Sequence, residues 1–298
     1  MNEEIFVYNR YGKAIERESI CGDWLMRFAY GNRFGRLLQA SIGSRIIFSR
    51  LASAVANRKF SAKYITPFAK RHGIAVEDCA EPIGNYGTFQ DFFTRKLRFG
   101  ARPLAASREA ICAPVDGRYL HIGPLPQAGA IPVKGRRLLL GQLLGSETLA
   151  EKFTGGSAIV ARLAPFDYHR IHFPCDCLPG QCMRLGRKLH GVHPQALRRV
   201  GALCANRRFL TRAAADCGEI AIVEVGATFV GSVRQTYVPG VYAKKGAEKG
   251  FFALGGSTVI LLFERGTLAV DDDISHWSSR SIETYVKMGD TIGGRQSP

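Results

Sequence analysis

Ser257 is the residue whose surroundings most clearly indicate chemistry. It follows Gly255 and Gly256 and precedes an apolar run at residues 259–263. A serine held between a flexible glycine turn and a buried strand is placed to attack the carbonyl carbon of the preceding residue. The chain would then cut itself between 256 and 257, and the serine would become a pyruvoyl group, an electron sink made from protein alone. The sequence therefore predicts a self-processing enzyme.

Three further polar residues could activate this serine. Asp116 lies in a Pro-Val-Asp-Gly turn, and His169 and His172 lie between Pro165 and Pro174. A Ser, a His and an Asp on separate segments can form an activated nucleophile in any chain order. Each also has a plainer interpretation, because a turn aspartate commonly bonds its own backbone and a histidine can be purely structural. The flanking prolines argue against a long metal-binding helix.

Eight cysteines in a chain of 298 residues favour reduced thiols over a disulfide framework. Cys175, Cys177 and Cys182 follow the two histidines closely. Their spacing fits no common structural zinc pattern, so we predict no metal site.

The net charge of +16 is unevenly placed, since residues 24–72 contain ten lysines and arginines and no aspartate or glutamate. Such a stretch predicts an acidic partner, either nucleic acid or an anionic membrane surface. Apolar residues recur near helical spacing between about 23 and 71, which predicts short helices. An amphipathic helix packed on the core is the usual explanation. The absence of acids instead favours a headgroup interface, as do the aromatic residues Trp24, Phe28, Tyr30 and Phe34.

From about Gly87 the chain changes to short β-type runs separated by glycine and proline, with a short helix predicted at 88–97. The predicted fold class is therefore α+β, with an N-terminal helical, membrane-associating segment at 1–85 and a mainly-β catalytic core at 86–298. No apolar run approaches the roughly 18–20 residues that span a bilayer, and the start lacks the layout of a secretory signal. Strands are predicted at 111–115, 119–122, 131–133, 157–163, 220–225, 258–263 and 284–287.

These segments together resemble the phosphatidylserine decarboxylase family of pyruvoyl enzymes. The likeness covers roughly residues 86–294 and rests on several motifs in the family's order. One departure is His193, which stands before Pro194 where many relatives have asparagine. The segments that carry the resemblance are 92–98 with 100–103, 114–117, 163–174, 226–232, 245–250, the Gly-Gly-Ser-Thr motif within 255–263, and 283–289.

The resemblance implies a self-processing triad in which His172 takes the proton from Ser257 and Asp116 orients the imidazole. Cleavage after Gly256 would give pieces 1–256 and 257–298, which should stay together because the small piece begins with a core strand. In turnover the pyruvoyl ketone would condense with the substrate amine and accept the electrons released as carbon dioxide leaves. We expect His172 to reprotonate the product, with His169 as second choice or as a positioning residue.

The implied reaction converts phosphatidylserine to phosphatidylethanolamine. The expected location is peripheral, on the cytoplasmic face of a bacterial-type cell membrane or on an organelle membrane, and the resemblance suggests a homodimer. One rival is a pyruvoyl decarboxylase of a soluble amino acid, which would not need residues 24–72 to bind membranes. Another is a non-enzymatic nucleic-acid-binding protein, motivated by a pI of 9.8 but lacking any clear zinc finger or RNA-binding signature. A relative that folds without maturing is disfavoured because all three triad residues are present.

Overall fold

The computed structural model describes residues 5–18, 54–126, 130–133, 136–186, 207–226, 233–253 and 257–296. Most of the predicted basic helical stretch, residues 23–53, lies outside the described residues. Gly255, Gly256 and His193 lie outside them as well.

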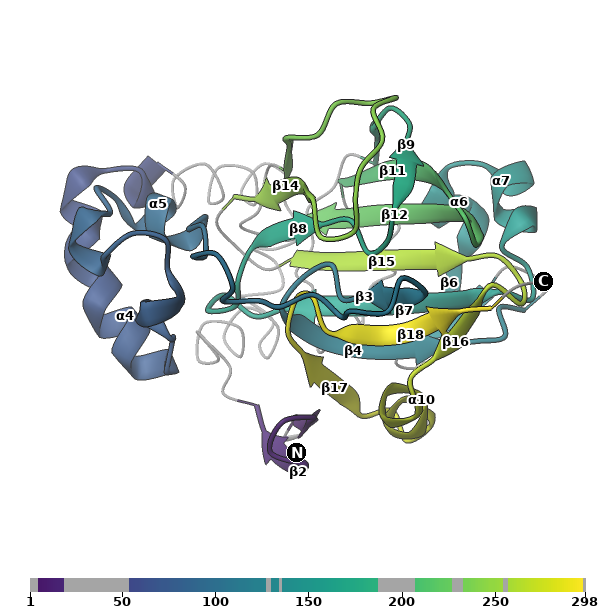
Figure 1. The fold of residues 1–298 in the computed structure, drawn as a ribbon, viewed down its shortest axis with the longest axis horizontal. Helices are drawn as coiled ribbons and strands as arrows, with labels where there is room; N and C mark the ends of the chain where they lie inside the picture. Colours follow the sequence, from purple (N-terminus) through teal and green to yellow (C-terminus); the bar gives the residue numbers. More distant parts are fainter. Residues whose placement is uncertain are drawn as a thin grey trace, which may run out of the picture.

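The described residues build a ten-stranded sheet in which β15 occupies a central place (Figure 1). All of its pairings are antiparallel except that of β1 with β17, which is parallel. A short strand, β9 (Cys177–Pro179), adds to the edge through β11. The main path runs β10 (Met183–Leu185), β11 (Arg208–Ala215), β12 (Gly218–Gly226), β15 (Ser257–Phe263), β7 (Ser157–Leu163), β4 (Gly117–Ile122), β17 (Glu283–Val286), β1 (Phe6–Asn9) and β2 (Ala14–Arg17).

Every residue of β15 is buried because the strand is covered on both faces. Alternate side chains divide between two cores, with Val259 and Leu261 in one and Ile260 and Leu262 in the other. The second core is closed by two short helices, α6 (Leu140–Leu144) and α7 (Glu147–Lys152).

The first core is closed by two small sheets. One contains β13 (Val233–Gln235), β14 (Glu248–Phe252) and β8 (Arg170–His172), and the other contains β16 (Leu268–Val270), β18 (Thr291–Arg295) and β3 (Ala110–Cys112). Helix α10 (Asp272–Ser279) packs near β4 and β17. A separate hairpin joins β5 (Ala130–Val133) and β6 (Arg136–Leu139).

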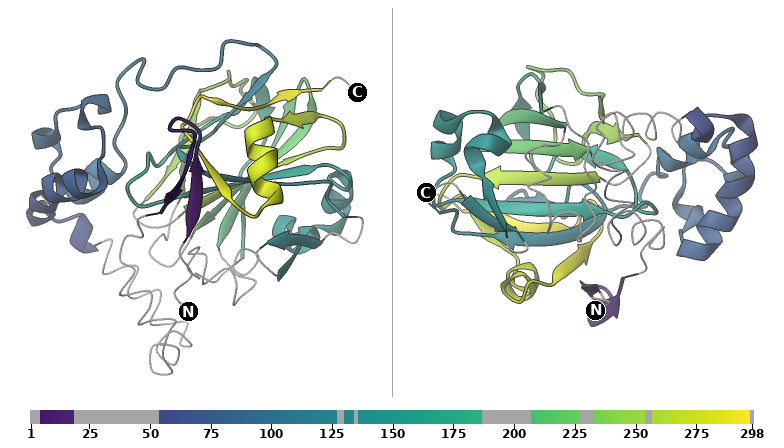
Figure 2. Two further views of the ribbon diagram at one scale, coloured as in Figure 1. Left: turned by 90° about the horizontal axis from the view of Figure 1, so that it is seen from below. Right: turned by 180° about the vertical axis from the view of Figure 1, so that it is seen from behind.

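A helical group stands beside one end of the sheet and has a small core of its own (Figure 2). Its helix α4 (Ile65–His72) is followed by Gly73, whose φ of +60° is the left-handed conformation that glycine adopts after helix ends. Stacking of His72 on Phe166, with ring centroids 5.0 Å apart, joins this group to the core. The group contains η1 (Lys59–Tyr64), α4 (Ile65–His72), η2 (Val76–Asp78), η3 (Ile83–Asn85) and α5 (Phe89–Phe93).

The predicted α+β class with a mainly-β core is confirmed, and the predicted strands are found within a few residues of their expected ends. The helix expected at 88–97 is shorter, because α5 begins after the capping residue Thr88 and ends at Phe93. The β1–β2 hairpin, which pairs with β17, was not predicted. In the part of the chain that the structure describes, no helix combines the length and apolar character needed to cross a bilayer.

Candidate active site

Ser257 is the first residue of β15 and is fully buried. It pairs with Gly226 of β12 on one side and with Leu163 of β7 on the other. Directly paired residues of antiparallel strands project to the same face, so Ser257 shares the face of Leu163. Leu163 packs in the same core as Ile171 of β8 and Phe252 of β14. The serine therefore lies on the sheet face that this small sheet covers.

His172, the last residue of β8, is held at three atoms. Its backbone N–H donates to the Pro114 carbonyl at 2.9 Å, its Nδ1 lies 2.8 Å from the Gly246 carbonyl oxygen, and its Nε2 lies 3.2 Å from the Tyr168 hydroxyl. A carbonyl oxygen can only accept, so Nδ1 carries the proton and Nε2 has the lone pair. Burial lowers the pKa of His172. The ring is therefore neutral at neutral pH, with a basic nitrogen at Nε2.

Gly246 presents its carbonyl to the imidazole from a turn that requires glycine. Its φ is +79°, and a Cβ there would lie 2.5 Å from a side-chain carbon of Leu104. The ammonium of Lys245 anchors the turn by donating to the carbonyls of Ala105 and Ser107 at 2.8 Å and 2.7 Å.

Asp116 lies in the turn that precedes β4 and is buried. Its carboxylate accepts from Arg102 Nη2 at 2.7 Å and from the backbone N–H of Met288 at 2.7 Å. Among the described residues, the acceptor at Nδ1 of His172 is thus a backbone carbonyl, and the orienting bond from Asp116 stays a prediction. Burial is the main cause of the lowered pKa of His172, and the charge of Asp116 acts against it, so the two side chains lie within electrostatic reach.

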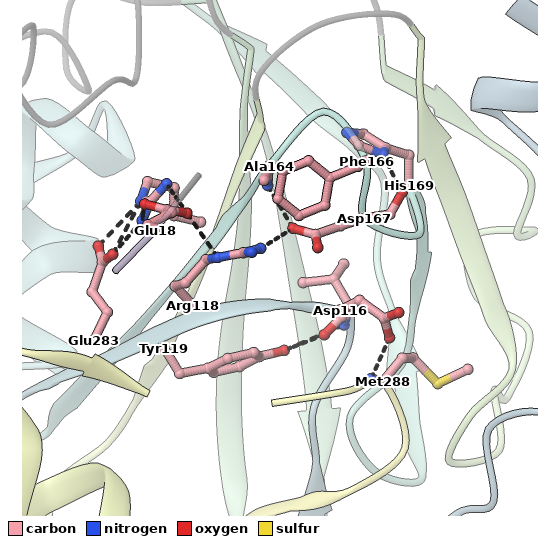
Figure 3. A network of polar contacts seen from close by, with 12 residues as sticks. Glu18, Asp116, Arg118, Tyr119, Ala164, Phe166, Asp167, His169, Glu283 and Met288 are labelled. Atoms are coloured by element: carbon pink, nitrogen blue, oxygen red, sulfur yellow. Dashed lines mark hydrogen bonds and ion pairs between the residues drawn. The ribbon is translucent and has the colours of Figure 1, made fainter. Parts of the chain in front are cut away.

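His169 is fully buried in the loop that joins β7 to β8. Its Nδ1 donates to the Asp167 carbonyl at 2.9 Å, and its ring packs on Phe93 with centroids 3.9 Å apart. The Asp167 carboxylate accepts from the backbone N–H of Ala164 at 2.5 Å and pairs with Arg118 (Figure 3). Burial raises the pKa of Asp167 to about 6, in spite of that arginine.

Comparison with known proteins identifies the family. A family model described as phosphatidylserine decarboxylase matches residues 89–294. The chain belongs to the phosphatidylserine decarboxylase family. Three similar proteins, each named phosphatidylserine decarboxylase proenzyme, come from Chlamydia muridarum (37% identical, covering 100% of both chains), Chlamydia trachomatis serovar L2 (38%, covering 99% of this chain and 98% of the relative) and Chlamydia felis (40%, covering 93% of both).

Backbone contacts join the segments that carry the four family-motif residues. Asp116 lies two residues after Pro114, which accepts the backbone N–H of His172. Ser257 is paired with Leu163, which ends the strand leading into the His169 loop. Gly256, the predicted cleavage partner, lies outside the described residues.

A cavity of about 400 Å³ is lined by part of this group and by several charged side chains. Asp116, Asp167 and Tyr168 line it, whereas His169, His172 and Ser257 are not among the described residues at its wall. Arginine and carboxylate side chains both line it, including Arg95, Arg102, Arg118, Glu18 and Asp78.

Sequence reasoning missed the parts played by Tyr168, Gly246 and Arg102. All three stand in family motifs, but the sequence does not show their contacts: Tyr168 reaches His172 within one motif, Arg102 reaches Asp116 fourteen residues away, and Gly246 reaches His172 from a distant segment. Arg170 of the same motif has a structural part, because it binds the Glu248 carboxylate with both oxygens at 2.9 Å.

The cysteines near the histidines are buried or half-buried free thiols. Cys175 is hydrogen-bonded to Cys217, which lies in the turn between β11 and β12. Within the described ranges, no group of three or more His, Cys, Asp or Glu residues is arranged to hold a metal ion.

Proposed function

We propose that this chain is a phosphatidylserine decarboxylase that generates a pyruvoyl group from Ser257. The observation that carries the proposal is the position of Ser257, buried at the first residue of a central strand and paired with Leu163. That pairing puts the start of β15 beside the end of β7, from which the loop carrying His169 leads to His172 in β8. The family match to residues 89–294 supports the same assignment.

Self-cleavage would begin with proton transfer from the Ser257 hydroxyl to Nε2 of His172. The neutral tautomer is suited to this step, because the Gly246 carbonyl keeps the ring proton on Nδ1. The serine oxygen then attacks the Gly256 carbonyl carbon and an ester replaces the peptide bond. Elimination releases residues 1–256 as a carboxylate and leaves dehydroalanine at position 257. Its imine tautomer is hydrolysed by water, which releases ammonia and leaves the pyruvoyl group. Nε2 lies 3.2 Å from the Tyr168 hydroxyl, and this hydrogen bond has to break before Nε2 can accept the serine proton.

Asp116 would stabilise the imidazolium that forms when His172 accepts the proton. Its carboxylate lies within electrostatic reach of the ring and is oriented by Arg102 and the Met288 N–H. A buried carboxylate that keeps its hydrogen-bond donors is a fixed negative charge, which favours the charged ring.

Once formed, the pyruvoyl group supplies a ketone that draws electrons from the carboxylate-bearing carbon of a bound amine. The chain's own residues then have to return a proton to that carbon. His172 is our first choice, and His169, whose Nδ1 is held by the Asp167 carbonyl, is the second. In both rings Nδ1 faces a fixed backbone carbonyl, which sets the tautomer of the neutral imidazole.

Membrane docking is proposed for the basic helical segment. In its described part, Val55, Phe60 and Tyr64 are 51%, 54% and 53% exposed. They alternate with basic residues, Arg58, Lys59 and Lys63, all of which are also exposed. Apolar side chains among cations suit the headgroup region of an anionic bilayer. The substrate would be taken from that bilayer.

The two pieces are proposed to stay associated after cleavage. The small piece would contribute β15, which is paired on both sides, by β12 and by β7. It would also contribute β17 and β18, which pair with β4 and β3 of the large piece. A homodimer remains a prediction from the resemblance.

The proposed function is tested with purified protein and vesicles that contain phosphatidylserine. We expect two pieces on a denaturing gel and release of carbon dioxide from the lipid. Free serine in place of the lipid should give no carbon dioxide. Turnover of a soluble amino acid but not of the lipid would contradict the proposed substrate.

A further inference from the structure

Two arginines are buried side by side in the main sheet. Arg118 of β4 pairs directly with Arg162 of β7, and their side chains are only 8% and 9% exposed. Adjacent positive charges that are taken out of water must be compensated by carboxylates. Three buried carboxylates do so: Glu18, Asp167 and Glu283.

Glu18 differs from the other two carboxylates because it contacts both arginines. Its Oε1 lies 2.8 Å from Arg118 Nε, and its Oε2 lies 2.7 Å from Arg162 Nη2. In the described structure, Asp167 pairs with Arg118 and Glu283 pairs with Arg162. The Glu18 side chain is 5% exposed although it lies at the end of the N-terminal hairpin, where its backbone N–H donates to Ile5.

The contacts continue from Glu18 to His169 without a gap. Glu18 forms an ion pair with Arg118, Arg118 binds the Asp167 carboxylate, and the Asp167 carbonyl accepts from Nδ1 of His169 (Figure 3). The Asp167 carboxylate also accepts the Ala164 N–H, which closes the turn at the start of the loop. A single carboxylate from the N-terminal hairpin therefore supports the loop of the family motif.

We propose that Glu18 is a positioning residue for decarboxylation, which holds Arg118 against Asp167 and so fixes the loop that carries His169. The inference rests on the proposed function, because it assigns a part in that reaction. A network of buried ion pairs adds little stability compared with apolar residues of the same size. We infer that the network contributes to activity instead, because it fixes the direction from which Arg118 approaches the loop.

Glu18 also bears on the charge of Asp167. Burial raises the pKa of Asp167 to about 6, Arg118 and the Ala164 N–H act against it, and the negative charge of Glu18 adds to it. Removing the charge of Glu18 should therefore lower that pKa. In that variant Asp167 would stay ionised, and paired with Arg118, at a lower pH than in the wild-type protein. The other charged or titratable groups that face Asp167 are Asp116 before β4, Arg95 after α5, and Tyr285 of β17.

The test compares Glu18→Gln with two matched variants in the full-length protein. Glu283→Gln removes the same charge from Arg162 but leaves Arg118 with both of its partners. Glu151→Gln changes an exposed glutamate of α7. Self-cleavage is read from a denaturing gel, and kcat and KM are measured on phosphatidylserine vesicles from pH 5 to 8.

We expect all three variants to self-cleave, because the proposed cleavage uses His172 and Ser257. Glu18→Gln should lower kcat by about tenfold or more with little change in KM, as a misplaced catalytic group does. Its activity should persist to a lower pH, because the pKa of Asp167 falls when the negative charge of Glu18 is removed. A kcat and pH profile equal to those of Glu151→Gln would overturn the inference.

Glu18→Asp keeps the test decisive if the glutamine variant does not fold. The shorter carboxylate keeps the charge but cannot reach both arginines. We therefore expect kcat to fall, while the pH at which activity is lost on the acid side stays that of the wild type. An unchanged kcat in this variant would also overturn the inference. A wild-type chain that is uncut and inactive would instead refute the proposed function, which separates the two failures.

Discussion

Ser257 and Leu163 are directly paired, and each stands at an end of its strand. Ser257 is the first residue of β15 and Leu163 is the last residue of β7. Because the two strands are antiparallel, the start of β15 and the end of β7 lie at the same end of the sheet. The bond that we expect to break therefore adjoins the loop with Asp167 and His169. The motifs that contain Leu163 and Ser257 are almost a hundred residues apart in the chain, and the register of β7 against β15 makes them neighbours.

Replacing Ser257 with alanine should abolish self-cleavage. The methyl group cannot attack the Gly256 carbonyl, so the variant should run as a single chain of 298 residues without decarboxylase activity. Ser279→Ala, at an exposed position on α10, is the matched control and should be cut as usual. Two pieces from the Ser257 variant would show that another residue is the nucleophile.

His172→Ala should slow self-cleavage by roughly 10²–10⁴-fold, the usual contribution of a positioned general base. The loss should appear as accumulated full-length chain in a time course of newly made protein. His276→Ala removes an exposed imidazole from α10 and should mature at the normal rate. Equal rates for the two variants would remove His172 from the cleavage mechanism.

Self-cleavage should have a pH dependence set by the lowered pKa of His172. Burial shifts that pKa below the ordinary value of 6.5, and only the neutral ring can accept the serine proton. The rate should thus be level from about pH 6.5 upward and fall as the pH drops through the lowered pKa. Pulse-labelled chain transferred to buffers of different pH would give this profile. A rate that climbs between pH 7 and 8 would require a raised pKa instead.

Vesicle binding should depend on the exposed aromatics of the helical group. Phe60→Ser and Tyr64→Ser together should weaken sedimentation with anionic vesicles by at least about tenfold, since burying one large apolar side chain is worth about 1.5–3 kcal/mol. Raised salt should weaken binding further by screening Lys59 and Lys63. Tyr242→Ser alters a tyrosine that is 58% exposed in another loop and serves as control. Equal loss in the control would argue against a specific docking face.

Much of the fold could be predicted because the core strands are continuous apolar runs. β15 was expected at 258–263 and extends over Ser257–Phe263, as a strand buried on both faces should. The β1–β2 hairpin could not be seen in the same way. Its strands are short and largely exposed, so they show no apolar alternation, and pairing with β17 depends on residues far along the chain.

The reactive side chains of the site could be predicted from the sequence, but the backbone groups that orient them could not. Ser257, His172 and Asp116 stand out as reactive types in short motifs. The acceptor at Nδ1 of His172 is the carbonyl of Gly246, and a carbonyl has no signature in the sequence. The pairing of Arg102 with Asp116 is likewise set by how the segment before β3 folds back.

Intact mass spectrometry of the purified wild-type protein tests the central claim most directly. Two polypeptides are expected, residues 1–256 and residues 257–298, with the smaller one lighter than its unmodified sequence by the mass of ammonia. That difference is the change from an N-terminal serine to a pyruvoyl group. A single polypeptide with the full mass of all 298 residues, and with a serine still present at position 257, would contradict the account.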